Sequence, residues 1–183
     1  MTPPAPRIIA GAWKGRRLTA PEGLETRPTN TRARQAIFDI LSHAPWCDLR
    51  GARVLDVFAG TGAYGLEALS RGAASAEFFE QSRLALAALQ QNITACGAAS
   101  RIIAGDILRA PPGDPHNLIF LDPPYGKSLI PQALSTLRAK NWLTPGAIIV
   151  AEFGPEDEME TPDLLAERTH GKARVKIWRE DQT

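Results

Sequence analysis

Short apolar segments alternate with amphipathic helical segments between residues 53 and 153, and this alternation most limits the folds open to the chain. Strands are predicted at residues 53–58, 76–80, 101–104, 117–121 and 147–153, and helices near residues 63–71, 82–96 and 128–140. Consecutive parallel strands need a crossover of a dozen or more residues, which is usually a helix. The repeated strand–helix order therefore predicts a mainly parallel, doubly wound sheet with right-handed crossovers.

The last part of the chain breaks this order. Residues 164–169 and 173–179 alternate apolar and polar side chains on either side of Gly171, which predicts an antiparallel pair of strands. Together with the preceding strands, this pair would complete a seven-stranded sheet that ends in a C-terminal antiparallel hairpin. The fold class is thus predicted to be α/β.

The N-terminal part is expected to be a small unit of residues 1–45 that packs on a main domain of residues 46–183. Residues 7–20 are predicted to form a short β-hairpin. Residues 31–43 are predicted to form a helix, because apolar side chains recur at helical spacing and polar residues that can cap a helix precede them.

Composition indicates a soluble globular protein. The chain has 183 residues, of which 44% are hydrophobic and 22% charged. Its two cysteines, Cys47 and Cys96, lack a close metal-type spacing and suggest reduced thiols. The histidines His43, His116 and His170 are too scattered for a metal site. No apolar run is long enough to cross a bilayer. We therefore expect a cytoplasmic monomer without membrane or metal.

Positive charge is concentrated near the N-terminus. The formal net charge of the whole chain is only +1, but residues 1–38 hold seven basic and two acidic side chains. Residues 152–163 hold six acidic side chains and no lysine or arginine. A basic segment on a nearly neutral body is typical of a localised phosphate-binding surface, although a solvated charged face would have the same composition.

A strand, a glycine-rich turn and a helix start follow one another in residues 54–65, VLDVFAGTGAYG. Gly60, Gly62 and Gly65 satisfy the pattern G-x-G-x-x-G, a weak signal that its place between strand and helix strengthens. Asp56, just before the turn, could interact with a cationic amino group.

Two further acids end the next strands. Glu80 could accept both hydroxyls of a ribose, and Asp106 could accept from an adenine amino group with Ile107 beside the ring. Each acid also has a structural interpretation, as an acceptor for loop amides or a helix cap. An adenosine with a charged amino-acid tail would use these acids together with Asp56, and S-adenosylmethionine is the most economical such ligand. A dinucleotide would use Glu80 but would offer Asp56 no cationic amino group to bind.

A rigid elbow follows the predicted strand at residues 117–121 and consists of Asp122, Pro123, Pro124 and Tyr125. Prolines remove backbone donors and fix φ, so the strand ends abruptly at the edge where open α/β sheets place ligands. The elbow would present a carboxylate, free carbonyls and a flat ring, which suit a planar amine. The alternative is a plain proline turn in which Tyr125 packs locally.

The glycine turn, Glu80, Asp106 and the DPPY elbow resemble, in this order, a class I, Rossmann-like, S-adenosylmethionine-dependent amino-methyltransferase. The segments RIIAGAWKGRRL, RPTNTRARQAIFDIL, VLDVFAGTGAYGLEALSRGA and FLDPPYG further resemble the RsmD family. Those bacterial enzymes methylate N2 of a guanine in 16S ribosomal RNA. The resemblance implies this activity here, with 16S rRNA or the assembling 30S subunit as partner. Gln81-Ser82 depart from the family pattern, so ribose binding is assigned to Glu80 alone.

The resemblance assigns the site residues to three groups. Catalysis is expected from Asp122, Pro123 and Tyr125, where the carboxylate and the Pro123 carbonyl bind the amine protons and the Tyr125 ring stacks on the base. The cofactor is expected against Asp56, Phe58, Gly60, Gly62, Glu80, Asp106, Ile107 and Asp122. RNA is expected at Lys14, Arg16, Arg17, Arg27, Thr29, Arg32 and Arg34.

Three alternatives remain open from the sequence. The same elbow would serve adenine N6 in DNA or RNA, or a protein glutamine amide, although the basic segment favours nucleic acid. An NAD-dependent oxidoreductase would fit the glycine pattern but leave the elbow unexplained. A non-catalytic RNA-binding module would leave every proposed catalytic part without a purpose.

Overall fold

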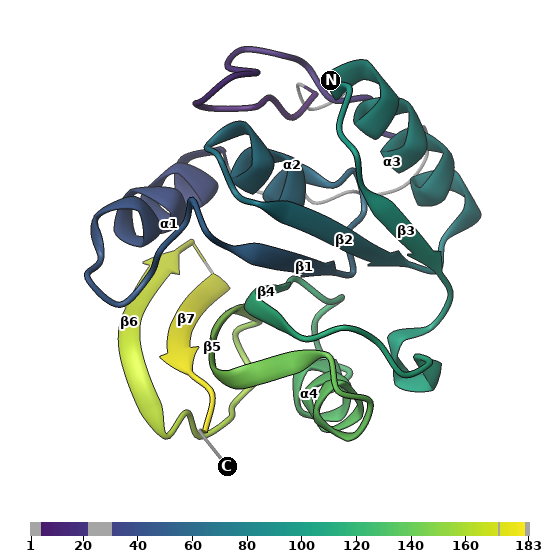
Figure 1. The fold of residues 1–183 in the computed structure, drawn as a ribbon. Coiled ribbons are helices and arrows are strands. Elements are labelled where there is room, and N and C mark those ends of the chain that lie inside the picture. Colours follow the sequence, from purple (N-terminus) through teal and green to yellow (C-terminus); the bar gives the residue numbers. More distant parts are fainter. Residues whose placement is uncertain (1–4, 22–30, 172, 182–183) are drawn as a thin grey trace.

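The computed structural model describes residues 5–21, 31–171 and 173–181, and a seven-stranded sheet forms its centre (Figure 1). The strands are β1 Arg53–Val57, β2 Ser75–Glu80, β3 Arg101–Ala104, β4 His116–Leu121, β5 Leu143–Phe153, β6 Asp163–His170 and β7 Ala173–Arg179. Their order in the sheet is β3-β2-β1-β4-β5-β7-β6. Strands β1 to β5 pair in parallel, whereas β7 runs antiparallel to both β5 and β6. The predicted sheet and its C-terminal antiparallel hairpin are confirmed.

The helices also lie where the sequence predicts them. They are α1 Thr31–His43, α2 Ala63–Ser70, α3 Arg83–Cys96, the short 3-10 helix η1 Ile107–Arg109, and α4 Leu129–Ala139. Strand β5 begins at Leu143, earlier than the sequence predicts, because a bulge in its pairing with β4 accommodates Pro145.

Two hydrophobic cores lie on opposite faces of the sheet. Helices α1, α2 and α3 cover one face, and α4 with η1 covers the other (Figure 1). On the first face the Phe120 ring stacks on Tyr64 at 4.9 Å and lies 5.5 Å from Phe38. On the second face Phe79 meets Trp142 edge-on at 5.0 Å. Because side chains alternate along a strand, each central strand contributes to both cores.

The predicted N-terminal hairpin is reduced to a single antiparallel bridge between Arg7 and Arg17. The N–H of Ile8 donates to the carbonyl of Arg16 at 2.9 Å, and the N–H of Gly15 donates to the carbonyl of Ile8 at 2.8 Å. Pairing stops there because the chain turns at residues 11–15 to follow the end of α2.

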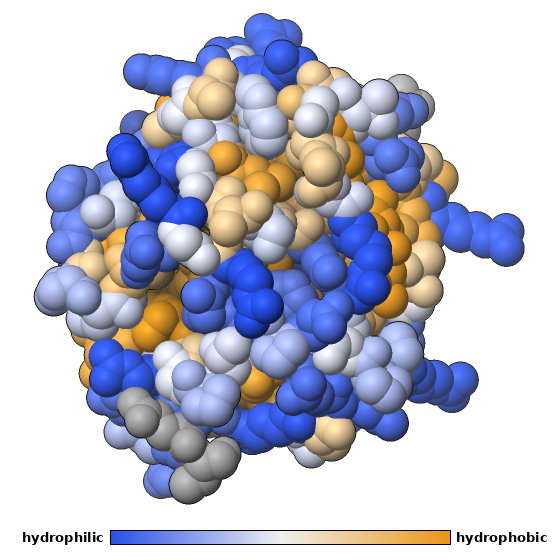
Figure 2. All heavy atoms as spheres, viewed as in Figure 1, coloured by the Kyte–Doolittle hydropathy of each residue, from blue (hydrophilic) through white to orange (hydrophobic). Residues whose placement is uncertain are grey.

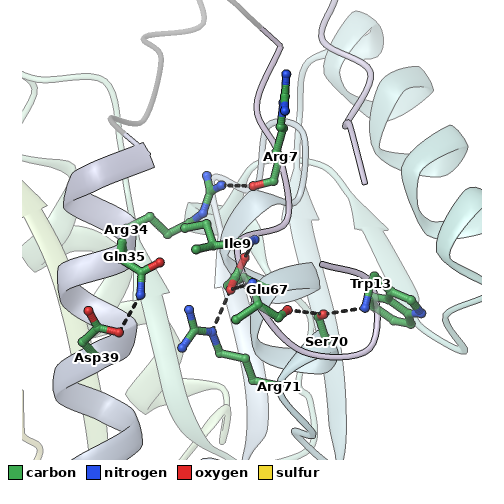
Figure 3. A network of polar contacts seen from close by, with 10 residues as sticks. Arg7, Ile9, Trp13, Arg34, Gln35, Asp39, Glu67, Ser70 and Arg71 are labelled. Atoms are coloured by element: carbon green, nitrogen blue, oxygen red, sulfur yellow. Dashed lines mark hydrogen bonds and ion pairs between the residues drawn. The ribbon is translucent and has the colours of Figure 1, made fainter. Parts of the chain in front are cut away.

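Glu67, a fully buried acid on α2, holds this N-terminal segment (Figure 3). Its carboxylate accepts the N–H of Ile9 at 2.7 Å, the N–H of Ala10 at 3.1 Å and Nε of Arg71 at 2.7 Å. A buried carboxylate is stable only when paired and hydrogen-bonded, and these donors meet that need. The segment is therefore attached to α2 by charge-assisted hydrogen bonds.

The face seen in Figure 1 carries mostly polar side chains at its periphery, with apolar atoms between them (Figure 2). Within the described part of the chain, no helix is long and apolar enough to cross a membrane.

Candidate active site at the carboxyl edge of the sheet

The parallel strands end at one edge of the sheet, and this edge brings the predicted acids together. Val57 at the end of β1 pairs with Leu121 at the end of β4, and Glu80 at the end of β2 pairs with Ala104 of β3. The acids at this edge are Glu80, Asp106 and Asp122. Asp56 lies one step further into the sheet, opposite Phe120. The edge beside β1 and β4 is also the point where the strand order reverses, which is where open α/β sheets bind ligands.

Side chains from three elements fix the glycine-rich turn after β1. Glu80 accepts the N–H of Gly60 at 2.7 Å, and Asp56 accepts the N–H of Gly65 at 2.8 Å. Asn92 of α3 donates to the carbonyl of Thr61 at 2.9 Å. The turn is therefore held in one conformation by groups from β1, β2 and α3.

Two glycines of this turn are required by the packing. Gly62 has φ +78° and starts α2, and a Cβ there would lie 2.6 Å from Leu89 Cδ1. At Gly65 a Cβ would lie 2.4 Å from Cε1 of Phe78. A larger residue at position 65 would push α2 away from β2, and one at position 62 would press on α3, so these glycines serve close packing of the helix.

Asp56 is buried, with 2% of its surface exposed. Burial raises its pKa well above the usual value, the Gly65 N–H lowers it, and the Asp122 and Glu80 carboxylates raise it further. The carboxylate thus holds the start of α2. It therefore has the structural role, as an acceptor for backbone amides, that the sequence allowed for each acid. A contact between Asp56 and the amino group of a ligand stays a prediction.

Glu80 is oriented by three backbone donors. One carboxylate oxygen accepts the N–H of Gly60, and the other accepts the N–H groups of Gln81 and Ser82 at 2.8 and 2.7 Å. A carboxylate has about four acceptor positions, so a ribose hydroxyl can still be bound. Gln81 and Ser82, which depart from the family pattern, contribute here through their backbones.

The residues expected near the adenine, Asp106, Ile107 and Phe58, differ in how deeply they are buried. Asp106 is half-buried and caps η1 by accepting the N–H of Leu108 at 3.0 Å. Ile107 is buried in the core on the α4 face. Phe58 is half-buried, packs against that same core and has φ +62°, an uncommon conformation for a residue with a side chain. Their contact with a cofactor stays a prediction.

The elbow after β4 is supported from β5. Asp122 and Tyr125 are half-buried, and Pro123 is buried. The Tyr125 hydroxyl donates to the carboxylate of Glu152 near the end of β5. A Cβ at Gly154 would lie 2.7 Å from Cγ of Tyr125, so the ring packs closely on this glycine.

Tyr64, at the start of α2, lies close to the same elbow. Burial raises its pKa well above the usual value, and the carboxylates of Asp122 and Glu152 raise it further. The sequence reasoning missed Tyr64, Asn92 and Glu152. Tyr64 belongs to the glycine motif and Glu152 to the acidic stretch, but their neighbours come from tertiary packing. Tyr64 meets Phe38 and Phe120 where α2 packs on the sheet, and Glu152 meets Tyr125 because β5 pairs with β4.

Most of the expected RNA-binding side chains in the described residues are exposed, namely Lys14, Arg16, Arg17 and Arg32. Arg16 also donates to the carbonyl of Ala95 at the end of α3, where the helix dipole favours a cation. Arg27 and Thr29 lie outside the described residues.

Arg34 does not lie on this basic surface, which corrects the sequence prediction. Its side chain is fully buried beneath α1 and donates to the carbonyl of Arg7 (Figure 3). Burial lowers its pKa, while the nearby Glu67, Tyr64 and Asp56 raise it. Position 34 belongs to the apolar face of α1 together with its core residues, so the guanidinium points inward instead of toward a phosphate.

The described residues contain no group of three or more His, Cys, Asp or Glu side chains that could hold a metal ion. The carboxylates at the sheet edge are instead engaged with backbone N–H groups or with the elbow. The edge presents carboxylate hydrogen-bond acceptors beside the glycine turn.

Comparison with solved structures supports this description of the fold. A structure called a putative methyltransferase yhhF from Escherichia coli has a TM-score of 0.85 and 34% identity, covering 97% of this chain and 99% of that chain. An RNA methyltransferase from Salinibacter ruber in complex with S-adenosyl-L-homocysteine has a TM-score of 0.67 at 17% identity, covering 85% of this chain and 95% of that chain. The fold is the Rossmann-like class I methyltransferase fold.

Comparison with curated sequences points the same way. Ribosomal RNA small subunit methyltransferase D of Escherichia coli K12 is 34% identical, over 96% of this chain and 90% of that protein. The putative rRNA methyltransferase YlbH of Bacillus subtilis is also 34% identical, over 94% of this chain and 98% of that protein. The family model described as conserved hypothetical protein 95 matches residues 6–179. The chain therefore belongs to this family, which is the RsmD family that its motifs resemble.

Proposed function

We propose that this protein transfers a methyl group from S-adenosylmethionine to the exocyclic N2 of a guanine in 16S ribosomal RNA. One observation carries the proposal: the Asp122–Tyr125 elbow ends β4 directly beside β1, whose glycine turn is fixed by acids. The elbow, which would bind a planar amine, therefore lies next to the glycine turn, which would bind a nucleoside. Relatives named as rRNA methyltransferases support the RNA substrate.

The residues at the sheet edge suit S-adenosylmethionine, which supplies an electrophilic methyl group and takes back the electron pair of the broken carbon–sulfur bond. Glu80 would accept from the ribose, and Asp106 would accept from the adenine amino group. A Cβ at Gly60 would meet nothing within 4 Å, so the turn leaves open space for a ligand beside Glu80. Asp56 would act mainly by holding α2 and the turn.

The elbow would make the acceptor nitrogen a better nucleophile. The lone pair of an exocyclic amine is delocalised into the ring, so the nitrogen alone reacts poorly. Hydrogen bonds from the amine protons to the Asp122 carboxylate and the Pro123 carbonyl would localise that lone pair on nitrogen. Asp122 would then accept the proton that the nitrogen loses, while the Tyr125 ring stacks on the base.

The exposed basic side chains would bind RNA phosphates. Lys14, Arg16 and Arg17 lie on the N-terminal segment and Arg32 lies on α1. RNA binding by Arg27 and Thr29, which lie outside the described residues, is part of the same proposal. We assign the small N-terminal unit of residues 1–45 to RNA binding and residues 46–183 to cofactor binding and catalysis. With 16S rRNA or the assembling 30S subunit as partner, the enzyme would act in the cytoplasm, as a monomer.

The proposal is tested by methyl transfer from labelled S-adenosylmethionine to 30S particles, naked rRNA, DNA or total protein. Label is expected in rRNA alone, and Asp122→Ala should lower the rate about 100-fold or more, a much larger effect than any loss of cofactor affinity. Asp181→Ala, which removes an exposed carboxylate, is the matched control and should leave the rate unchanged. Label in DNA or protein would favour the alternative acceptors, and full activity of Asp122→Ala would refute the assigned role.

A further inference from the structure

We propose that Glu152 reads the N1–H of the acceptor guanine and thereby selects guanine over other bases that carry an exocyclic amine. This inference rests on the proposed function and extends it from the reacting amine to the identity of the base. Three observations carry it: the pairing of β4 with β5, the hydrogen bond from Tyr125, and the distribution of donors on guanine.

The first observation is the register of β4 and β5. Leu121 pairs in parallel with Ala151, and both are buried in the core on the α4 face. Glu152, the next residue of β5, and Asp122, which directly follows β4, therefore lie side by side, and the alternation along β5 directs Glu152 toward the opposite face. Tyr64 of α2 lies on that face, and both carboxylates influence its ionisation. Asp122 and Glu152 thus line the same side of the sheet edge.

The second observation is that Glu152 and the elbow form one unit. The Tyr125 hydroxyl donates to Oε1 of Glu152, and Tyr125 packs closely on Gly154. A carboxylate accepts several hydrogen bonds, so the bond from Tyr125 leaves Glu152 able to accept another. Glu152 is half-buried, which strengthens such a bond relative to one made in water.

The third observation concerns the base. Guanine presents N1–H and the N2 amine as adjacent donors, whereas N1 of adenine is an acceptor. If Asp122 and Pro123 bind the N2 protons, the next donor along the same edge is N1–H, and the neighbouring strand provides Glu152 for it. The same carboxylate would repel the N1 lone pair of adenine. Paired contacts of this kind discriminate between bases by about 5- to 150-fold.

The test compares two bases at the methylated position, mapped first with the wild-type enzyme. The rRNA carries either guanine or 2-aminopurine there; 2-aminopurine keeps the N2 amine but has an acceptor at N1. The wild-type enzyme should prefer guanine in kcat/KM on the order of 10- to 100-fold. Glu152→Gln should bring this ratio close to one, because its amide can also donate to N1.

Tyr125→Phe is the matched control. It removes the hydroxyl that binds Glu152 and keeps the ring, so it should lower kcat yet preserve the preference for guanine. If Glu152 only oriented Tyr125, both variants would change kcat alike and neither would change the preference. Glu152→Ala provides a second variant if the glutamine variant does not fold, and it should show the same loss of preference.

The outcomes separate the two proposals. An unchanged preference in Glu152→Gln, with N2 of guanine still methylated by the wild-type enzyme, would overturn the role of Glu152 alone. Methylation of adenine N6 or of protein by the wild-type enzyme would overturn the proposed function, and the role of Glu152 with it. Cofactor affinity should be the same in the Glu152 variants, because β4 separates β5, which carries Glu152, from β1 and its glycine turn.

Discussion

Replacing Asn92 with alanine would test how the N-terminal segment and the glycine turn are joined. Asn92 is buried on α3, with 2% of its surface exposed. Its Oδ1 accepts the N–H of Thr19 at 2.7 Å, and its Nδ2 donates to the carbonyls of Thr19 at 3.0 Å and Thr61 at 2.9 Å. One side chain thus links the basic segment to the turn that we assign to the cofactor.

The expected cost follows from these three hydrogen bonds. Each contributes a net stabilisation of about 1 kcal/mol, so Asn92→Ala should lower the free energy of unfolding by about 3 kcal/mol. That is a large part of the 5–15 kcal/mol typical of a domain. The bond to Thr61 alone fixes the turn, and its loss of about 1 kcal/mol should weaken cofactor binding about five-fold.

Urea denaturation and calorimetric titration with S-adenosylmethionine measure the two effects separately. The control is Gln90→Ala, because Gln90 is exposed on the same helix and donates to the Thr94 hydroxyl over a long 3.4 Å. The control should change neither quantity. If the free energy of unfolding of Asn92→Ala lies within about 0.5 kcal/mol of the wild-type value, the three hydrogen bonds do not stabilise the fold and the argument is refuted.

Three further predictions concern single residues. Gly154→Ala should slow methyl transfer while cofactor affinity is retained, because the new Cβ would displace the Tyr125 ring; single-turnover rates measure this. Burial raises the pKa of Cys47 to about 11, so the rate of its alkylation by iodoacetamide should rise about tenfold per pH unit up to that pH. The stability of the protein should also fall above pH 9, because the thiol then loses its proton when the chain unfolds. Asp56→Asn keeps an acceptor for the Gly65 N–H and removes a buried charge. Because burial raises the pKa of Asp56, the wild-type protein should lose stability as pH rises above the ordinary aspartate range, and Asp56→Asn should not. The free energy of unfolding of the variant relative to wild type should therefore increase with pH, as measured by urea denaturation.

Much of the fold could be predicted because local signals agree with the global structure. The alternating strands and helices lie within a few residues of their predicted bounds, and the antiparallel pair around Gly171 follows from its own period-2 pattern. The strand-end acids were found for the same reason. Parallel strands bring their carboxyl ends to one edge, so Glu80, Asp106 and Asp122 needed only their place after a strand.

The remainder depends on tertiary contacts that no local pattern encodes. Arg34 is basic and follows a basic segment, yet its position on the apolar face of α1 buries it. Glu67 and Asn92 hold the N-terminal segment, but each bond joins residues more than fifty positions apart. Glu152 meets Tyr125 only because β5 lies beside β4. Sequence reasoning thus placed Glu80, Asp106 and Asp122 at this edge and missed the side chains that lie against them.

The identity of the methylated nucleoside tests the central claim most directly. Unmethylated 30S subunits are incubated with the enzyme and S-adenosylmethionine, the 16S rRNA is digested, and its nucleosides are separated by mass spectrometry. The account predicts one new N2-methylguanosine per rRNA, which Asp122→Ala forms about 100-fold more slowly or slower still. A new N6-methyladenosine, or no new nucleoside at all, would contradict it.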